Sequence, residues 1–138
     1  MTTTIESQGV TLEISFGESP TSFSTIVNVI DFSGPGGQAS VIDITHLAST
    51  AREKRMGLPD EGQLTFNVNL DPDAATHTTI RDARTQREKC EFRITLTDTT
   101  PTTITFFGYV LGFVVSGAVD DVVKAAITVE IDGAVAWA

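Results

Sequence analysis

The stretch VIDITHLASTAREKRMGLPDEGQLTFNVNLDPD, residues 41–73, decides the fold of this chain. Apolar and polar side chains alternate through residues 42–45 and again through residues 64–70. Alternation with a period of two is typical of a strand that buries one face and exposes the other. We therefore expect two strands that flank a long connection. The side chains expected in a sandwich core are Ile42, Ile44, Phe66 and Val68.

The connection between these strands, residues 48–61, is too long for a tight hairpin turn, and we expect a protruding loop. It mixes acidic and basic side chains with the apolar Met56 and Leu58. A charge run is usually a solvated loop, but apolar side chains within one are costly to expose and useful in an interface. We predict a contact loop for a protein partner, consisting of Arg52, Glu53, Lys54, Arg55, Met56, Gly57, Leu58, Pro59 and Asp60.

The rest of the chain is rich in threonine and in turn signals, which indicates further strands. We expect them at about residues 11–16, 23–32, 92–97, 104–115 and 123–131, with a turn at the glycine-rich residues 34–37. Glycines within the strand at 104–115 predict a bulge, a bend or a close backbone approach.

One helix is expected at about residues 72–88, where Asp71 is a suitable N-cap and Pro72 a suitable first helical residue. Its few apolar side chains predict a helix on the outside of a sheet. The expected fold is all-β with one flanking α-helix and two packed sheets, as a sandwich or barrel. It forms a single domain over residues 1–138, and residues 1–10 are expected to be a flexible N-terminal arm.

Composition excludes several classes of function. The formal net charge of −9 over 138 residues argues against an external nucleic-acid-binding face and against adsorption to anionic membranes. No run of apolar residues is long enough to span a membrane, and the first residues show no secretory signal. A single cysteine, Cys90, excludes an internal disulfide.

No set of residues is predicted to carry chemistry. His46 and His77 lack the spacing of a metal pair, and Cys90 is best explained as a packed thiol. The acidic residues at 71–73 and 120–121 are explained by capping and by a turn. We therefore expect no catalytic residue, no metal site and no cofactor.

From residue 41 to its end, the chain resembles the major tail tube proteins of phages with long non-contractile tails. The C-terminal segments GYV (residues 108–110) and GAVAW (133–137) also fit that family. The motifs that carry the resemblance are IDIT (42–45), STARE (49–53), GLPDEG (57–62) and NLDP (69–72).

The resemblance implies a structural protein that self-assembles into stacked hexameric rings, whose joined inner sheets line a channel for the genome. It implies that the loop at residues 48–61 reaches the adjoining ring. The implied partners are further copies of the chain and the tail initiator, tape-measure and terminator proteins. DNA would pass non-specifically, with no membrane involved. The implied location is the virion tail, assembled in the host cytoplasm. The side chains expected to face the lumen are Asp43, Thr45, Thr65, Asn67 and Asn69.

Other classes remain open at this point. The tube protein of a contractile tail or of a secretion system shares the architecture. A small β-sandwich that binds carbohydrate would expose several aromatic side chains, whereas Tyr109 and Trp137 are the only Tyr and Trp of the chain. A small β-barrel enzyme would need a histidine or carboxylate pair in a pocket, and the sequence shows no convincing pair.

Overall fold

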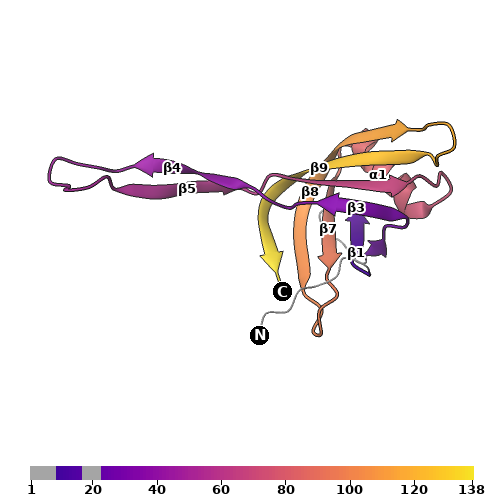
Figure 1. Cartoon of the computed structure of the whole chain (residues 1–138), viewed down its shortest axis with the longest axis horizontal. Coiled ribbons are helices and arrows are strands. Elements are labelled where there is room, and N and C mark those ends of the chain that lie inside the picture. The colour runs from indigo at the N-terminus through magenta and orange to yellow at the C-terminus, as the bar shows by residue number, and fades with distance from the viewer. Residues whose placement is uncertain (1–8, 17–22) are drawn as a thin grey trace.

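A two-stranded arm extends from one end of a curled β-sheet in the computed structural model, which describes residues 9–16 and 23–138 (Figure 1). Most of the predicted N-terminal arm lies outside these residues. The elements in chain order are β1 (Thr11–Phe16), β2 (Ser24–Thr25), β3 (Val29–Ser33), β4 (Gln38–Asp43), β5 (Lys54–Asp60), β6 (Gln63–Asn69), α1 (Ala75–Gln86), β7 (Lys89–Thr95), β8 (Thr103–Ser116) and β9 (Lys124–Trp137).

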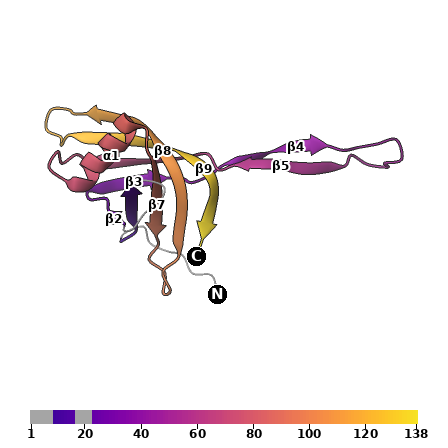
Figure 2. The same cartoon turned by 180° about the vertical axis from the view of Figure 1, so that it is seen from behind.

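The body is one antiparallel sheet in the order β2-β1-β7-β8-β9-β6-β3. Its longest strands, β8 and β9, curve strongly, and α1 lies against one end of the curled sheet (Figure 2). The pairing of β8 with β9 shifts register between Thr105 and Phe107 and between Val110 and Gly112. Such bulges bend a strand and increase its twist. The expected all-β fold with one flanking helix is confirmed. In the body, a single sheet that curls around the core takes the place of two separate sheets.

The core fills the inner face of this sheet and follows the period-two pattern of its strands. In β6, Leu64, Phe66 and Val68 are each at most 1% exposed, which confirms the burial predicted for Phe66 and Val68. Across the sheet, the rings of Phe92 and Phe106 stack with centroids 5.8 Å apart. Full burial of such apolar side chains contributes about 1.5–3 kcal/mol each, so this face stabilises the body without help from the arm.

The helix is shorter than expected and begins later. Its N-cap is Ala74, which makes no side-chain capping bond, so the prediction of Asp71 as N-cap and Pro72 as first helical residue is wrong. Asp71 instead accepts a hydrogen bond from the backbone N–H of Asp73 at 3.0 Å, which forms a turn ahead of the helix. As expected, α1 flanks the sheet, and it buries Ile80 in the core.

The sequence prediction for the arm was wrong in two respects. The segment at residues 48–61, predicted to be a loop, contains the strand β5, which pairs with β4. Ile42 and Ile44, expected in the core, are 50% and 40% exposed. The reason is geometric, because a two-stranded ribbon that leaves the body has no second layer to cover either of its faces.

Candidate assembly surfaces

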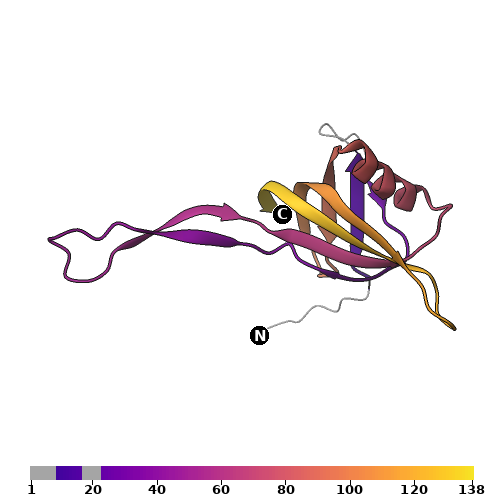
Figure 3. The same cartoon turned by 90° about the horizontal axis from the view of Figure 1, so that it is seen from above.

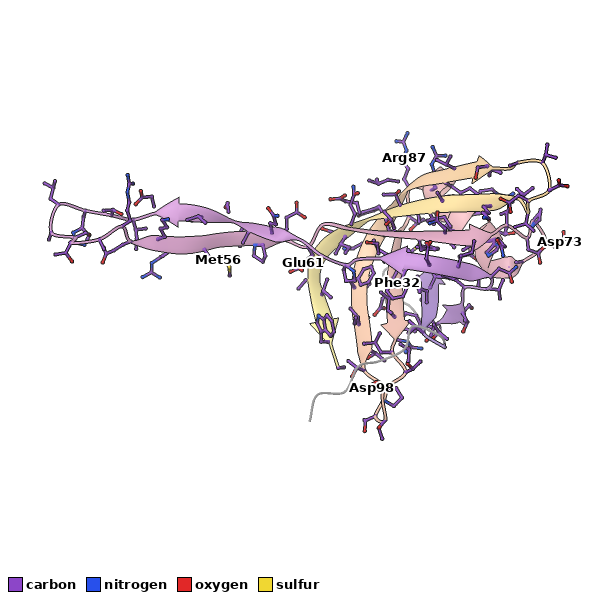
Figure 4. All side chains as sticks on the ribbon, in the orientation of Figure 1. Phe32, Met56, Glu61, Asp73, Arg87 and Asp98 are labelled. Carbon is purple, nitrogen blue, oxygen red and sulfur yellow. The ribbon has the colours of Figure 1, made fainter. Side chains whose placement is uncertain are left out.

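The root of the arm is a close crossing of two chain segments. Gly36 and Gly62 form an isolated parallel bridge there. A Cβ atom on Gly37 would lie 1.6 Å from the carbonyl oxygen of Asp60, and one on Gly62 would lie 1.9 Å from that of Gly36. Side chains cannot fit at this crossing, so glycine is required for the segments to approach. Figure 4 labels Glu61 at this junction and shows the arm leaving the body beside it.

The end of the arm is held by a local polar network. The backbone N–H of His46 donates to Ser49 Oγ at 3.1 Å, and Ser49 Oγ donates to Glu53 Oε2 at 2.8 Å. The backbone N–H of Glu53 donates to Thr45 Oγ1 at 2.9 Å, and His46 Nε2 lies 3.2 Å from Glu53 Oε2. Thr45 and Glu53, at the two sides of the turn, are therefore fixed to each other before any partner is present.

Asp43 is the charged anchor at the base of this turn. Its Oδ1 accepts the backbone N–H of Thr45 at 2.9 Å, and its Oδ2 accepts a hydrogen bond from Arg52. Hydrogen bonds from the hydroxyl and the backbone of Thr45, followed by the bond from Arg52, hold the pKa of Asp43 below its ordinary value. These bonds favour the charged form of the carboxyl group.

Replacing Thr45 with valine should raise the pKa of Asp43 toward the ordinary value, because the largest contribution to the lowered pKa is removed. The lowered pKa means that the charged contacts of Asp43 persist above it and are lost as the pH falls through it. Carboxyl-carbon NMR during a pH titration measures the change. Asp98 is the internal control, since Thr102 lowers its pKa in the same way, and its titration should not move. An unchanged Asp43 titration would contradict the assignment.

Large apolar side chains are exposed along the arm. The predicted contact residues Met56 and Leu58 are 76% and 92% exposed, and the sequence analysis missed Val41 and Leu47, which are 67% and 106% exposed. In the sequence, the adjacent apolar pair Val41 and Ile42 interrupts strict alternation, which indicates that both faces of this strand need cover. No comparable pattern marks Leu47. Of the other predicted contact residues, Arg52 and Glu53 lie in the turn, and the remainder belong to β5. These are Lys54, Arg55, Gly57, Pro59 and Asp60.

Both faces of the ribbon are apolar and charged. Val41 lies opposite Met56, and Asp43 opposite Lys54, so these four share one face. Ile42 lies opposite Arg55 on the other face. Neither face is covered by the body, and the arm therefore offers contact surface on both sides.

The residues predicted to face the lumen fall into two separate groups. Thr65, Asn67 and Asn69 lie together on the face of β6 that points away from the core, whereas Asp43 and Thr45 lie on the arm. The structure therefore does not bring the five together.

The outer face around β6 is polar with few charges. Asn67 Nδ2 donates to Asp31 Oδ1 at 2.7 Å, and Gln63 Nε2 donates to Glu130 Oε2 at 2.8 Å. Thr65 lies between Ser33 and Thr128 on the neighbouring strands.

A second exposed apolar surface lies at the end of the β8–β9 hairpin, and sequence analysis missed it. Val119 is 94% exposed, and Val114, Val115 and Val122 are between 53% and 63% exposed. The valines on either side of Asp120-Asp121 were the available signal. A solvated turn is usually built from polar residues, and exposed valines are unfavourable in water. This end of the hairpin is therefore suited to a contact with another protein surface.

Features that could carry chemistry have structural roles. His77 is 2% exposed, with Nε2 2.7 Å from the carbonyl oxygen of Val27 and Nδ1 accepting the backbone N–H of Asp71 at 3.1 Å. Cys90 is buried, and its thiol lies 3.9 Å from the carbonyl oxygen of Glu88. Among residues 9–16 and 23–138, no group of three or more His, Cys, Asp or Glu could hold a metal ion. The same residues contain no helix long and apolar enough to cross a membrane.

Comparisons with known proteins address the fold first. The structure is similar to the SPP1 tail tube (TM-score 0.75, 14% identity), covering 97% of this chain and 78% of that one. It is similar to the tail of an empty GTA particle (TM-score 0.76, 15% identity), covering 96% and 98%. It is also similar to a chain of the anti-feeding prophage baseplate (TM-score 0.75, 11% identity), covering 100% and 97%. No curated protein matches the sequence.

The family comes from the sequence itself. A family model described as "Phage tail tube, TTP, lambda-like" matches residues 3–102, well over half of the chain. The matched segment includes the whole arm, strand β6 and helix α1. The chain therefore belongs to the lambda-like family of phage tail tube proteins, structural proteins of the virion tail.

Proposed function

We propose that copies of this chain form hexameric rings that stack into a tail tube, and that the tube conducts DNA during delivery. The arm carries this proposal. An isolated two-stranded hairpin is at best marginally stable in water, and this one exposes apolar side chains on both faces. Burial of those side chains by a neighbouring subunit supplies the missing layer. The arm spans about 30 Å from its root, at about 3.3 Å per residue, which is long enough to reach a subunit in the next ring.

The edges of the body sheet support ring closure. Strand β3 lies at one end of the strand order and β2 at the other, so each pairs within the sheet on one side. An open edge presents unpaired backbone groups that readily join another strand. Pairing of such edges between subunits is a heterologous contact, which closes into a ring when the rotation fits. The similar GTA tail was computed with C6 symmetry.

The outer face of β6 is the surface we assign to the channel, through Thr65, Asn67 and Asn69. The amides and hydroxyls of these residues carry no cation, and the neighbouring Lys124 is paired with Asp121, so little counterion release would drive DNA to adhere. The net charge of −9 per chain adds repulsion, which screening limits to about 8 Å at physiological salt. We place assembly in the host cytoplasm. The proposed partners are the tail initiator, tape-measure and terminator proteins.

Purified protein should assemble into rings or tubes as its concentration rises. Light scattering and negative-stain microscopy over a range of salt concentrations measure this, with tail initiator proteins added to promote nucleation. A compact monomer under every condition, with the initiator present, would contradict the proposal.

A further inference from the structure

The molecule has two unlike ends. The arm leaves one end of the body, and the β8–β9 hairpin projects from the other (Figure 3). The turn before α1 belongs to the hairpin end, because Leu70 N–H donates to the carbonyl oxygen of Val123 at 2.9 Å. Figure 4 places Asp73 at this end and Met56 on the arm, on opposite sides of the body.

The hairpin end is acidic and apolar. Residues 70–73 and 117–123 contain four aspartates and no basic residue. The nearby Lys124 pairs with one of the four, its Nζ lying 3.5 Å from Asp121 Oδ2. The exposed Val119 and Val122 lie beside these carboxylates. We call this surface, formed by Asp71, Asp73, Val119, Asp120, Asp121 and Val122, the acidic end.

Residues 54–56 of the arm have the complementary character. Arg52 is paired with Asp43, but Lys54 and Arg55 have no ion-pair partner among the residues that the structure describes. The exposed Met56 shares one face of the ribbon with Lys54, whereas Arg55 lies on the other face, opposite the exposed Ile42. Each face of the arm thus presents one such cation near an exposed apolar side chain, at one end of a molecule whose other end offers carboxylates beside valines.

We propose that the arm of one copy docks on the acidic end of the next copy. This inference rests on the proposed stacking of subunits and names the receiving surface for the arm. Because donor and acceptor lie at opposite ends, each docked copy presents a new free end, and the contact repeats without closing on itself. Carboxylates would pair with Lys54 and Arg55, while Met56 and the valines would leave water together.

Two substitutions at one site separate charge from apolar contact. Val119→Lys and Val119→Asp both remove the same exposed valine, and neither touches the core. In the protein with its natural arm, a lysine at this position repels Lys54 and Arg55, whereas an aspartate attracts them. Val119→Lys should therefore raise the critical concentration for polymerisation about fivefold more than Val119→Asp, the size expected from the loss of a few exposed charge pairs. When combined with Lys54→Glu and Arg55→Glu, the order should reverse. A purely structural effect at Val119 would not change sign with the arm.

A cross-link tests proximity independently of growth. A Met56→Cys variant mixed with a Val119→Cys variant should form a disulfide-linked pair on oxidation, whereas a Met56→Cys variant mixed with a Leu111→Cys variant should not. Cys90 is buried in all of them.

The two readouts distinguish this inference from the proposed function. Tubes without the reversal and without the cross-link would overturn the docking surface and leave the tube function standing. A cross-link without any polymer would support docking and contradict tube formation. The absence of polymer and of cross-link would overturn both.

Discussion

Replacing residues 40–58 with Asn-Gly should abolish tube growth and leave a folded monomer. Ala39 and Pro59 form a cross-strand pair, so a two-residue turn can join them in the existing register. Deleting residues 52–60 alone would be a poorer test, because β4 would lose its partner β5. The core residues lie in the body, and the free energy of unfolding should change by no more than about 1 kcal/mol.

Thermal unfolding and sedimentation would show the folded monomer, and negative-stain microscopy would show the loss of tubes. A full-length arm with Leu47, Met56 and Leu58 changed to serine is the matched variant, since it keeps the reach of the arm and removes its most exposed apolar side chains. It should also fail to grow. Tubes of normal length from the shortened protein would show that the arm is not the stacking element.

The body could be predicted because its alternating strands bury their apolar faces within the same chain. The strand pattern of residues 64–70 is realised in β6, and the strand expected at residues 11–16 is β1. Both strands contribute fully buried side chains to one core. Where a single chain supplies both layers, period-two alternation is enough to assign each side chain to a face.

The same pattern misled in the arm. Alternation at Ile42 and Ile44 indicates a face that must be covered, but it does not say whether the cover comes from this chain or from another. Gly57 and Pro59 are residue types that are uncommon inside a strand. A two-stranded ribbon tolerates them, because both of its strands are edges and a missing N–H can point to solvent. The apolar residues that the body fails to cover are those that an assembly requires.

The prediction of where the helix begins was wrong for a more local reason. Aspartate favours both an N-cap and a turn, because in each case its carboxylate accepts a backbone N–H two or three residues ahead. At Asp71 that donor is Asp73, which places the bond in a turn. The residue type thus indicated a bond of this kind, but α1 begins only after Ala74, and its buried residues Ile80 and Ala83 lie well inside the helix.

Thr65 is the best position at which to test the channel wall. A lysine at Asn67 would lie beside Asp31, which would neutralise it, and Asn69 already faces Lys124 across the sheet. Thr65 lies between Ser33 and Thr128, so a new cation there has no carboxylate directly opposite. The position is exposed, and substitution should change the free energy of unfolding by no more than about 0.5 kcal/mol.

Thr65→Lys should therefore allow tubes to form and should slow DNA release at low salt. Each subunit would add one cation to the wall, and stacked rings would repeat it along the whole tube. Cations that neutralise phosphates release counterions, so binding weakens steeply with salt, with a slope of about −0.9 per phosphate contacted. Release measured by dye fluorescence should accordingly recover as salt rises, whereas particles carrying Thr65→Gln should release DNA normally at every salt concentration. Normal release from the lysine variant at low salt would place Thr65 away from the channel and remove β6 from its wall.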